Sequence, residues 1–156
     1  MKKLKEGVVA PDFKTTDQDG KTHKLSDYRG QWVLIYFYPK DDTPGCTKEA
    51  CAIRDQMADF KKLKLKIFGV STQDAKSHKK FALKYDLPFT LLVDRDKKIV
   101  TKYGVWGKKK FMSREYMGTL RTSFLIDPKG KIAKIYENVK PEIHAEEIRD
   151  DLKKLK

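Results

Sequence analysis

The chain has 156 residues, enough for one domain with a substantial core, and its 35 basic and 22 acidic side chains give a formal net charge of +13. No apolar run approaches the roughly 18 residues that span a bilayer, so we expect a single domain over residues 1–156 and no membrane segment. Because the basic residues are scattered and no basic helix carries interleaved aromatic residues, we expect no specific nucleic-acid binding, only weak affinity for polyanions at low salt.

The N-terminal part of the chain predicts a hairpin, a strand and a long helix. Short alternating segments at residues 13–15 and 22–25 flank the turn D-Q-D-G, which indicates an N-terminal β-hairpin. Residues 32–38 form a continuous run of β-favouring apolar residues, which is typical of a buried central strand. Apolar residues then recur at helical spacing, which predicts a helix that follows Thr43 and runs to about Lys62.

The rest of the chain continues to alternate strands and helices. We expect strands at residues 65–71 and 90–93, helices at 74–85, 97–103 and 142–155, an irregular basic loop at 104–119, and a hairpin of residues 121–126 and 131–136 turning through D-P-K-G. The order β-α-β-α-β, followed by a hairpin and a helix, predicts an α/β protein whose central mixed sheet is flanked by helices on both sides.

The chain has two cysteines, and both lie in the segment that follows the long apolar strand. Thr43 is a typical N-cap and Pro44 a typical first helical residue, so Cys46 falls near the third helical position. There, unpaired backbone N–H groups and the helix dipole favour a thiolate over a neutral thiol. Because Cys46 shares the apolar stripe of the helix, its sulfur should face the protein body, whereas Cys51 faces elsewhere.

The spacing of the two cysteines excludes a disulfide within an intact helix. Residues five apart in an ideal helix have Cα atoms about 8.7 Å apart, whereas a disulfide needs a Cα separation of about 7 Å or less. Either the two thiols never pair, or the first turns of the helix unwind to let them. The basic N-terminus is not followed by an apolar segment, so we expect a cytoplasmic, reducing location in which such a disulfide would be transient.

This cysteine segment resembles the peroxiredoxin family, in the branch of bacterioferritin comigratory protein and peroxiredoxin Q. The signature P-x-x-x-T-x-x-C is matched by Pro39, Thr43 and Cys46, and Cys51 matches the second cysteine of the branch. The resemblance extends over nearly the whole chain through A-P-D-F at residues 10–13, F-G-V-S at 68–71, G-V-W-G at 104–107 and R-T-S-F-L-I-D at 121–127. It implies a thioredoxin-like fold with an N-terminal β-hairpin extension, and a thiol-dependent peroxidase that uses no cofactor or metal.

The resemblance also implies a reaction sequence for the two cysteines. Cys46 would reduce hydrogen peroxide or an organic hydroperoxide and become a sulfenic acid. After the helix start unwinds, Cys51 would attack the sulfenic sulfur and form an intramolecular disulfide. An external dithiol, thioredoxin by family resemblance, would then reduce that disulfide. We expect a monomer, with a weak homodimer as the alternative.

Further roles follow for residues around Cys46. The Thr43 hydroxyl and the backbone N–H groups near Gly45 and Cys46 are candidates to bind the peroxide oxygens. Arg121 matches the catalytic arginine of the family, and its planar guanidinium supplies a fixed charge with several donors. Pro39 would shape the pocket and shield the sulfenic acid, and Glu49 is a candidate to orient Arg121.

Each role has a simpler structural alternative. Cys46 could be an inert buried thiol, Thr43 only a helix cap, Arg121 a surface strand residue and Cys51 a packing residue. Four large residues of the basic loop could line the peroxide entry, form a subunit contact or only pack against one another: Trp106, Phe111, Met112 and Tyr116. His23, His78 and His144 match no metal-binding spacing, so we interpret them as structural or surface residues.

Two other function classes stay open at this point. One is a thioredoxin-type dithiol oxidoreductase, although such enzymes usually carry C-x-x-C rather than the C-x-x-x-x-C of this chain. The other is a basic binding protein without enzymatic activity. An insulin-reduction assay would separate a dithiol oxidoreductase from a peroxidase. Salt-dependent retention on nucleic acid, without peroxidase activity, would favour the binding protein.

Overall fold

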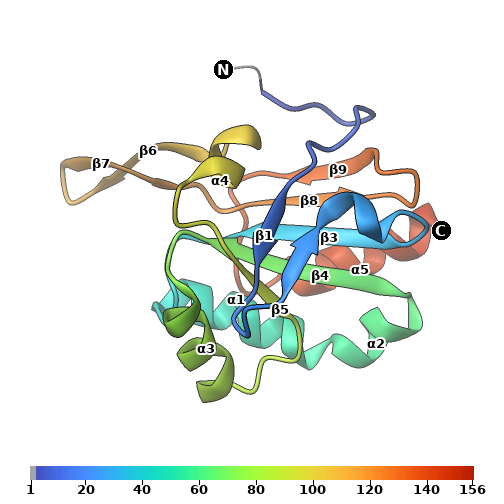
Figure 1. Cartoon of the computed structure of the whole chain (residues 1–156), viewed down its shortest axis with the longest axis horizontal. Helices are drawn as coiled ribbons and strands as arrows, with labels where there is room; N and C mark the ends of the chain where they lie inside the picture. The colour runs from blue at the N-terminus through green and yellow to red at the C-terminus, as the bar shows by residue number, and fades with distance from the viewer. Residues whose placement is uncertain (1–2) are drawn as a thin grey trace.

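A computed structural model of the chain describes residues 3–156 as a central sheet with helices against it (Figure 1). The strands are β1 (Lys14–Thr16), β2 (Thr22–Lys24), β3 (Trp32–Phe37), β4 (Leu65–Ser71), β5 (Thr90–Val93), β6 (Trp106–Phe111), β7 (Arg114–Thr119), β8 (Thr122–Ile126) and β9 (Ile132–Tyr136). The helices are α1 (Pro44–Asp55), α2 (Met57–Lys62), α3 (Ala75–Lys84), α4 (Lys98–Lys102) and α5 (His144–Leu155), with a 3₁₀ turn at Leu25–Tyr28.

The central sheet has the strand order β5-β4-β3-β8-β9. β3, β4 and β5 run parallel and are joined through helices, whereas β8 pairs antiparallel with β3, and β9 antiparallel with β8. β3 therefore lies in the middle, where Leu34 faces Ile67 on one side and Leu125 on the other. This arrangement confirms the predicted mixed sheet, and β1 and β2 pair as the predicted N-terminal hairpin.

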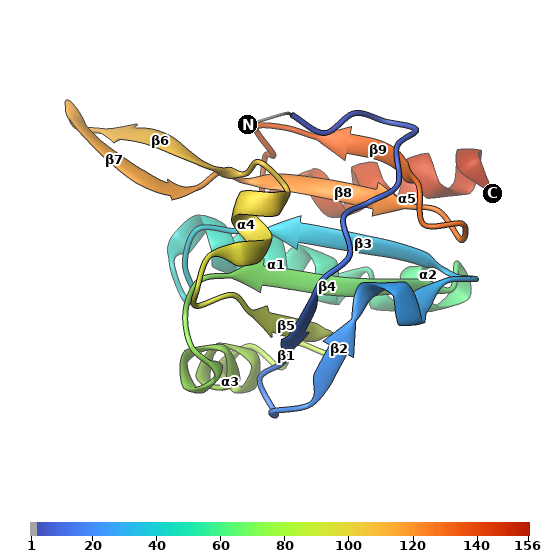
Figure 2. The same ribbon diagram turned by 45° about the horizontal axis from the view of Figure 1, so that its top comes forward.

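Side chains of β3 pack into two separate cores, because successive residues of a strand point to opposite faces. Residues 34, 36 and 38 lie in a cluster with side chains of α1, α2, α3 and α5. Residues 33, 35 and 37 lie in a second cluster with α4 and the N-terminal segment, on the other side of the sheet (Figure 2). Because β3 is buried on both faces, its sequence is a continuous run of apolar residues.

The predicted loop at residues 104–119 is wrong, because this segment forms a β-hairpin. β6 and β7 pair antiparallel from Trp106 opposite Thr119 to Phe111 opposite Arg114. Met112 and Ser113 form the turn with φ of 49° and 69°, the left-handed conformation that two-residue hairpin turns require. The turn has no glycine or asparagine, and three consecutive lysines interrupt the alternation of apolar and polar residues in β6. The two usual sequence signals of a hairpin are therefore absent. The hairpin projects away from the body of the protein (Figures 1 and 2).

The long helix that we expected to reach Lys62 is interrupted. α1 ends at Asp55 and α2 begins at Met57, because the backbone of Gln56 leaves the helical region with φ −100° and ψ 7°. Ile53, Met57 and Phe60 keep helical spacing across the break, so periodicity did not reveal it. Among the helices of residues 3–156, none is long and apolar enough to cross a membrane.

Candidate active site

Cys46 lies in the first turn of α1, which begins just beyond the carboxyl end of β3. Its side chain is 1% exposed and belongs to the same cluster as Tyr36, Tyr38 and Ala50, so the sulfur faces the protein body as predicted. Cys51 is half-buried, and both thiols are free. Since both lie within α1, the ideal-helix separation of about 8.7 Å applies, and pairing requires the helix to unwind.

Arg121 places a fixed positive charge beside the Cys46 sulfur. It immediately precedes β8, the antiparallel neighbour of β3, and this pairing carries it to the start of α1. Its Nη2 donates to Cys46 Sγ at 3.5 Å, and its Nη1 donates to Glu49 Oε1 at 2.8 Å. The structure therefore brings Cys46, Glu49 and Arg121 together, and Glu49 holds one arm of the guanidinium while the other points to sulfur.

The electrostatics of this triad follow from its burial. Glu49 is 1% exposed, and the loss of solvation raises its pKa to about 7, although Arg121 acts in the opposite direction. Burial alone lowers the pKa of Arg121, but the neighbouring Cys46 sulfur and Glu49 carboxylate outweigh it and raise that pKa above its usual value. The second carboxylate oxygen, Glu49 Oε2, and the Tyr36 hydroxyl have no hydrogen-bond partner within residues 3–156.

Gly45 has a role that sequence reasoning missed. A Cβ atom at this position would lie 3.0 Å from Arg121 Nη2, closer than side chains normally approach. The missing side chain therefore lets the guanidinium lie against the first turn of α1, next to the sulfur. The sequence signal for this role is a glycine, which disfavours helix, placed directly before Cys46 in the first turn.

Thr43 differs from its prediction in one respect. It occupies the N-cap position with an extended backbone, but its side chain makes no capping hydrogen bond. The hydroxyl instead donates to Lys40 O at 2.8 Å, within the same loop. A hydroxyl that has given its only proton to a carbonyl can serve a peroxide only as an acceptor. Pro39 is half-buried in the same loop, and its carbonyl accepts a hydrogen bond from Gln73 Nε2 at 3.3 Å.

The large side chains of residues 104–119, the segment that we expected to form a loop, do not pack against one another. Phe111 and Met112 are 65% and 84% exposed at the end of the β6–β7 hairpin, and Tyr116 is also exposed. Trp106 instead packs against the second core, where Lys97 Nζ lies 5.2 Å from its ring centre. The interpretation of a self-packing aromatic loop is therefore wrong.

The three histidines are all buried, which excludes the surface alternative for them. Each ring is held by specific partners: His23 by Asp17 and Tyr28, His78 by Asp41 and Leu92, and His144 by Ser123 and Glu147. Buried imidazoles with both nitrogens engaged are fixed parts of the structure.

Comparisons with known proteins identify the family of this chain. The family model described as the AhpC/TSA family matches residues 7–135. The chain is 45% identical to peroxiredoxin Bcp of Escherichia coli over 153 residues, 98% of each chain, and 46% identical to peroxiredoxin Bcp of Bacillus subtilis over 147 residues, 94% of each.

A solved structure gives the same result for the fold. The bacterioferritin comigratory protein of Xanthomonas campestris superposes with a TM-score of 0.89 at 31% identity, covering 97% of this chain and 99% of that one. That structure comes from a study of its alkyl peroxide reduction activity. The relatives from Escherichia coli and Bacillus subtilis are both named as peroxiredoxins. The chain therefore belongs to the AhpC/TSA family, in its Bcp and peroxiredoxin Q branch, and is a thiol peroxidase with a thioredoxin-like fold.

Proposed function

We propose that Cys46 is the thiol that attacks the peroxide, that Cys51 resolves the product, and that a dithiol reductant of the thioredoxin type completes the cycle. The observation that carries this assignment is the position of Arg121 Nη2, 3.5 Å from Cys46 Sγ, in the first turn of α1. Hydrogen peroxide and organic hydroperoxides are the proposed substrates, because the chemistry needs only an O–O bond next to a thiolate.

In the first step, the Cys46 thiolate attacks one peroxide oxygen and the O–O bond breaks. Sulfur becomes a sulfenic acid, and the departing hydroxide or alkoxide takes up one proton to leave as water or an alcohol. Negative charge spreads over sulfur and both oxygens in the transition state, so donors fixed around that position lower the barrier. Arg121 and the backbone N–H groups of the first turn of α1 supply those donors, and Thr43 supplies an acceptor for the peroxide proton.

In the second step, the Cys51 thiolate attacks the sulfenic sulfur, the S–O bond breaks as the disulfide forms, and the departing hydroxide takes up one proton to leave as water. This step needs the start of α1 to unwind, but the C-terminal end of α1 is held in place. There, Arg54 Nη1 donates to Tyr85 O at 2.7 Å and ties α1 to the C-terminal end of α3. Local opening of one or two helical turns, rather than of the domain, is then sufficient.

In the third step, an external dithiol attacks the disulfide and returns both cysteines to thiols. Because this disulfide is made and broken in each cycle, we propose a reducing compartment, the cytoplasm, as the location. No step of the cycle needs a second copy of the chain, which supports the proposal of a monomer.

Two cysteine variants test the assignment. Cys46→Ser should show no peroxide reduction, whereas Cys51→Ser should consume about one equivalent of peroxide and then lose turnover supported by thioredoxin. Normal thioredoxin-supported turnover of Cys51→Ser would remove Cys51 from the mechanism. Full activity of Cys46→Ser would remove the central assignment.

A further inference from the structure

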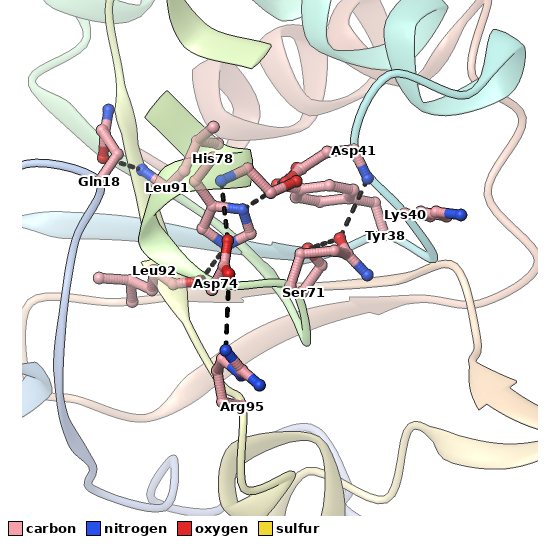
Figure 3. Close-up of polar contacts among 12 residues, drawn as sticks. Gln18, Tyr38, Lys40, Asp41, Ser71, Asp74, His78, Leu91, Leu92 and Arg95 are labelled. Carbon is pink, nitrogen blue, oxygen red and sulfur yellow. Dashed lines mark hydrogen bonds and ion pairs between the residues drawn. The ribbon is translucent and has the colours of Figure 1, made fainter. Parts of the chain in front are cut away.

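A buried polar cluster lies directly behind the loop of residues 39–43 that precedes Cys46 (Figure 3). His78 of α3 is fully buried, and its Nδ1 lies 2.6 Å from Asp41 Oδ2. Its Nε2 lies 2.8 Å from the backbone carbonyl oxygen of Leu92 in β5. The cluster therefore joins three parts of the fold: the active-site loop, α3 and the edge strand of the sheet.

The partners of His78 define where its protons are. A carbonyl oxygen can only accept, so Nε2 carries hydrogen and donates to Leu92 O. Asp41 Oδ2 is also an acceptor when ionised, so a second proton must lie between Nδ1 and the carboxylate. Asp41 accepts two more hydrogen bonds, from Tyr38 Oη at 2.6 Å and from Ser77 Oγ at 2.7 Å, so both of its oxygens are engaged. His78 and Asp41 thus form a buried pair whose polar side-chain atoms all have hydrogen-bond partners.

The same cluster holds the backbone of the loop. The Asp41 N–H donates to Gln73 Oε1 at 3.0 Å, and Gln73 Nε2 donates to Pro39 O at 3.3 Å. Ser71 Oγ donates to the same Gln73 oxygen at 2.6 Å, which fixes the amide. Both ends of the Pro39–Asp41 segment are therefore tied to the end of β4.

Other contacts of the loop are weaker anchors. Asp42 is exposed and binds Lys84 and Tyr85, and exposed ion pairs hold a backbone loosely. The Thr43 hydroxyl donates to Lys40 O inside the loop, and the Thr43 carbonyl accepts from the Thr47 N–H of α1 at 2.8 Å, so Thr43 connects the loop to the start of the helix. The buried cluster is the strong connection between the loop and the rigid sheet.

We propose that His78 and Asp41 are positioning residues for the peroxide step. They hold in place the loop of Pro39 and Thr43, which leads directly into the first turn of α1. Their effect is on the capture and alignment of the peroxide, not on the nucleophilicity of Cys46, because neither residue contacts the sulfur within hydrogen-bond distance. A small displacement of groups that align reactants is enough to slow a reaction strongly.

The chain contains a matched control for this proposal. His23 is also buried and also pairs with an aspartate, with Nε2 at 2.7 Å from Asp17 Oδ2 and Nδ1 at 2.7 Å from Tyr28 Oη. This pair lies in the β1–β2 hairpin region and makes no contact with the active-site loop. Loss of His23 therefore reports what removal of a buried His–Asp pair does to the protein in general.

The experiment compares His78→Asn with His23→Asn in two reactions of Cys46. Quenched-flow alkylation gives the second-order rate constant with hydrogen peroxide, and peptide mass spectrometry gives the rate of alkylation by iodoacetamide. In His78→Asn we expect the peroxide rate to fall roughly ten- to a hundredfold, with the iodoacetamide rate within about twofold of wild type. In His23→Asn both rates should stay within about twofold of wild type.

Tyr38→Phe provides the conservative variant, since it removes one donor to Asp41 and keeps the buried ring. We expect a native circular dichroism spectrum and a peroxide rate lowered by about threefold or more. A wild-type peroxide rate in folded His78→Asn or Tyr38→Phe would overturn the proposal, as would an equal loss in His23→Asn or an equal loss with both reagents. A wild-type protein that does not react with peroxide would instead speak against the peroxidase assignment.

Discussion

Arg121 Nη2 lies 3.5 Å from Cys46 Sγ although 75 positions separate the two residues in the chain. The contact exists because β8 pairs with β3, which places the residue before β8 beside the helix that follows β3. The guanidinium serves two partners at once, sulfur through Nη2 and Glu49 through Nη1. Several properties of the enzyme depend on this double contact.

Arg121→Lys should lower the rate constant for peroxide by about a hundredfold or more. A lysine ammonium is a point charge and lacks the planar fork that reaches both Glu49 and the sulfur, and removal of one oxyanion donor commonly costs this much. Arg95→Lys, at an exposed position paired only with Asp74, is the control and should keep the wild-type rate. A wild-type rate in Arg121→Lys would show that charge alone is sufficient.

Glu49→Gln should change how stability depends on pH. The pKa of Glu49 is raised from 4.5 to about 7 by burial, so the folded protein holds a proton that the unfolded chain releases near pH 4.5. The resulting stabilisation is complete below pH 4.5 and is lost as pH rises to about 7, by at most about 3 kcal/mol. Glutamine does not titrate, so the variant should lack this decline.

Thermal unfolding measured between pH 4.5 and 7.5 checks the prediction for Glu49. The wild type should lose stability relative to Glu49→Gln as pH rises through this window. Glu146→Gln, at an exposed position of α5, is the control and should follow the wild-type curve. Parallel curves for the wild type and Glu49→Gln would contradict the assignment.

Gly45→Ala should slow the reaction with peroxide by about tenfold without destabilising the protein. The new methyl group would lie 3.0 Å from Arg121 Nη2 and displace the guanidinium from the sulfur. Alanine is a better helix former than glycine, so the melting temperature should be unchanged or higher. Lys48→Ala, exposed in the same helix, should retain the wild-type rate. An unchanged rate in Gly45→Ala would mean that Arg121 has room to adjust.

The tip of the β6–β7 hairpin should contribute little to folding. Phe111 and Met112 are largely exposed, so replacing both by serine removes almost no buried apolar area. We expect a change in the free energy of unfolding within about 0.5 kcal/mol, measured by urea denaturation. Phe124→Ala, from the second core, should cost about 3–5 kcal/mol in the same assay. A large loss from the double serine variant would indicate that the tip packs against something in solution.

Sequence patterns predicted the elements that bury a regular apolar face. The run at residues 32–38 became β3 because both faces of a central strand are covered, and the spacing of Cys46, Ala50 and Ile53 placed all three against the sheet. Helix geometry also predicted that Cys46 and Cys51 cannot form a disulfide while the helix is intact, because their Cα atoms are too far apart.

Features that depend on tertiary contacts were harder to predict from the sequence. Arg121 reaches Cys46 through strand pairing, which spacing along the chain does not encode, and only the family resemblance indicated it. The β6–β7 hairpin escaped prediction because Met112 and Ser113 make its turn without glycine or asparagine. The Thr43 hydroxyl binds Lys40 O instead of capping α1, a choice between two nearby partners that sequence does not decide.

The mass of the intact chain after one equivalent of hydrogen peroxide tests the central claim most directly. The account predicts a loss of about two mass units under non-reducing conditions, with Cys46 and Cys51 found in one cross-linked peptide. Addition of a dithiol should restore the original mass. A lasting gain of about 16 mass units in the folded protein, or two unmodified thiols, would contradict it.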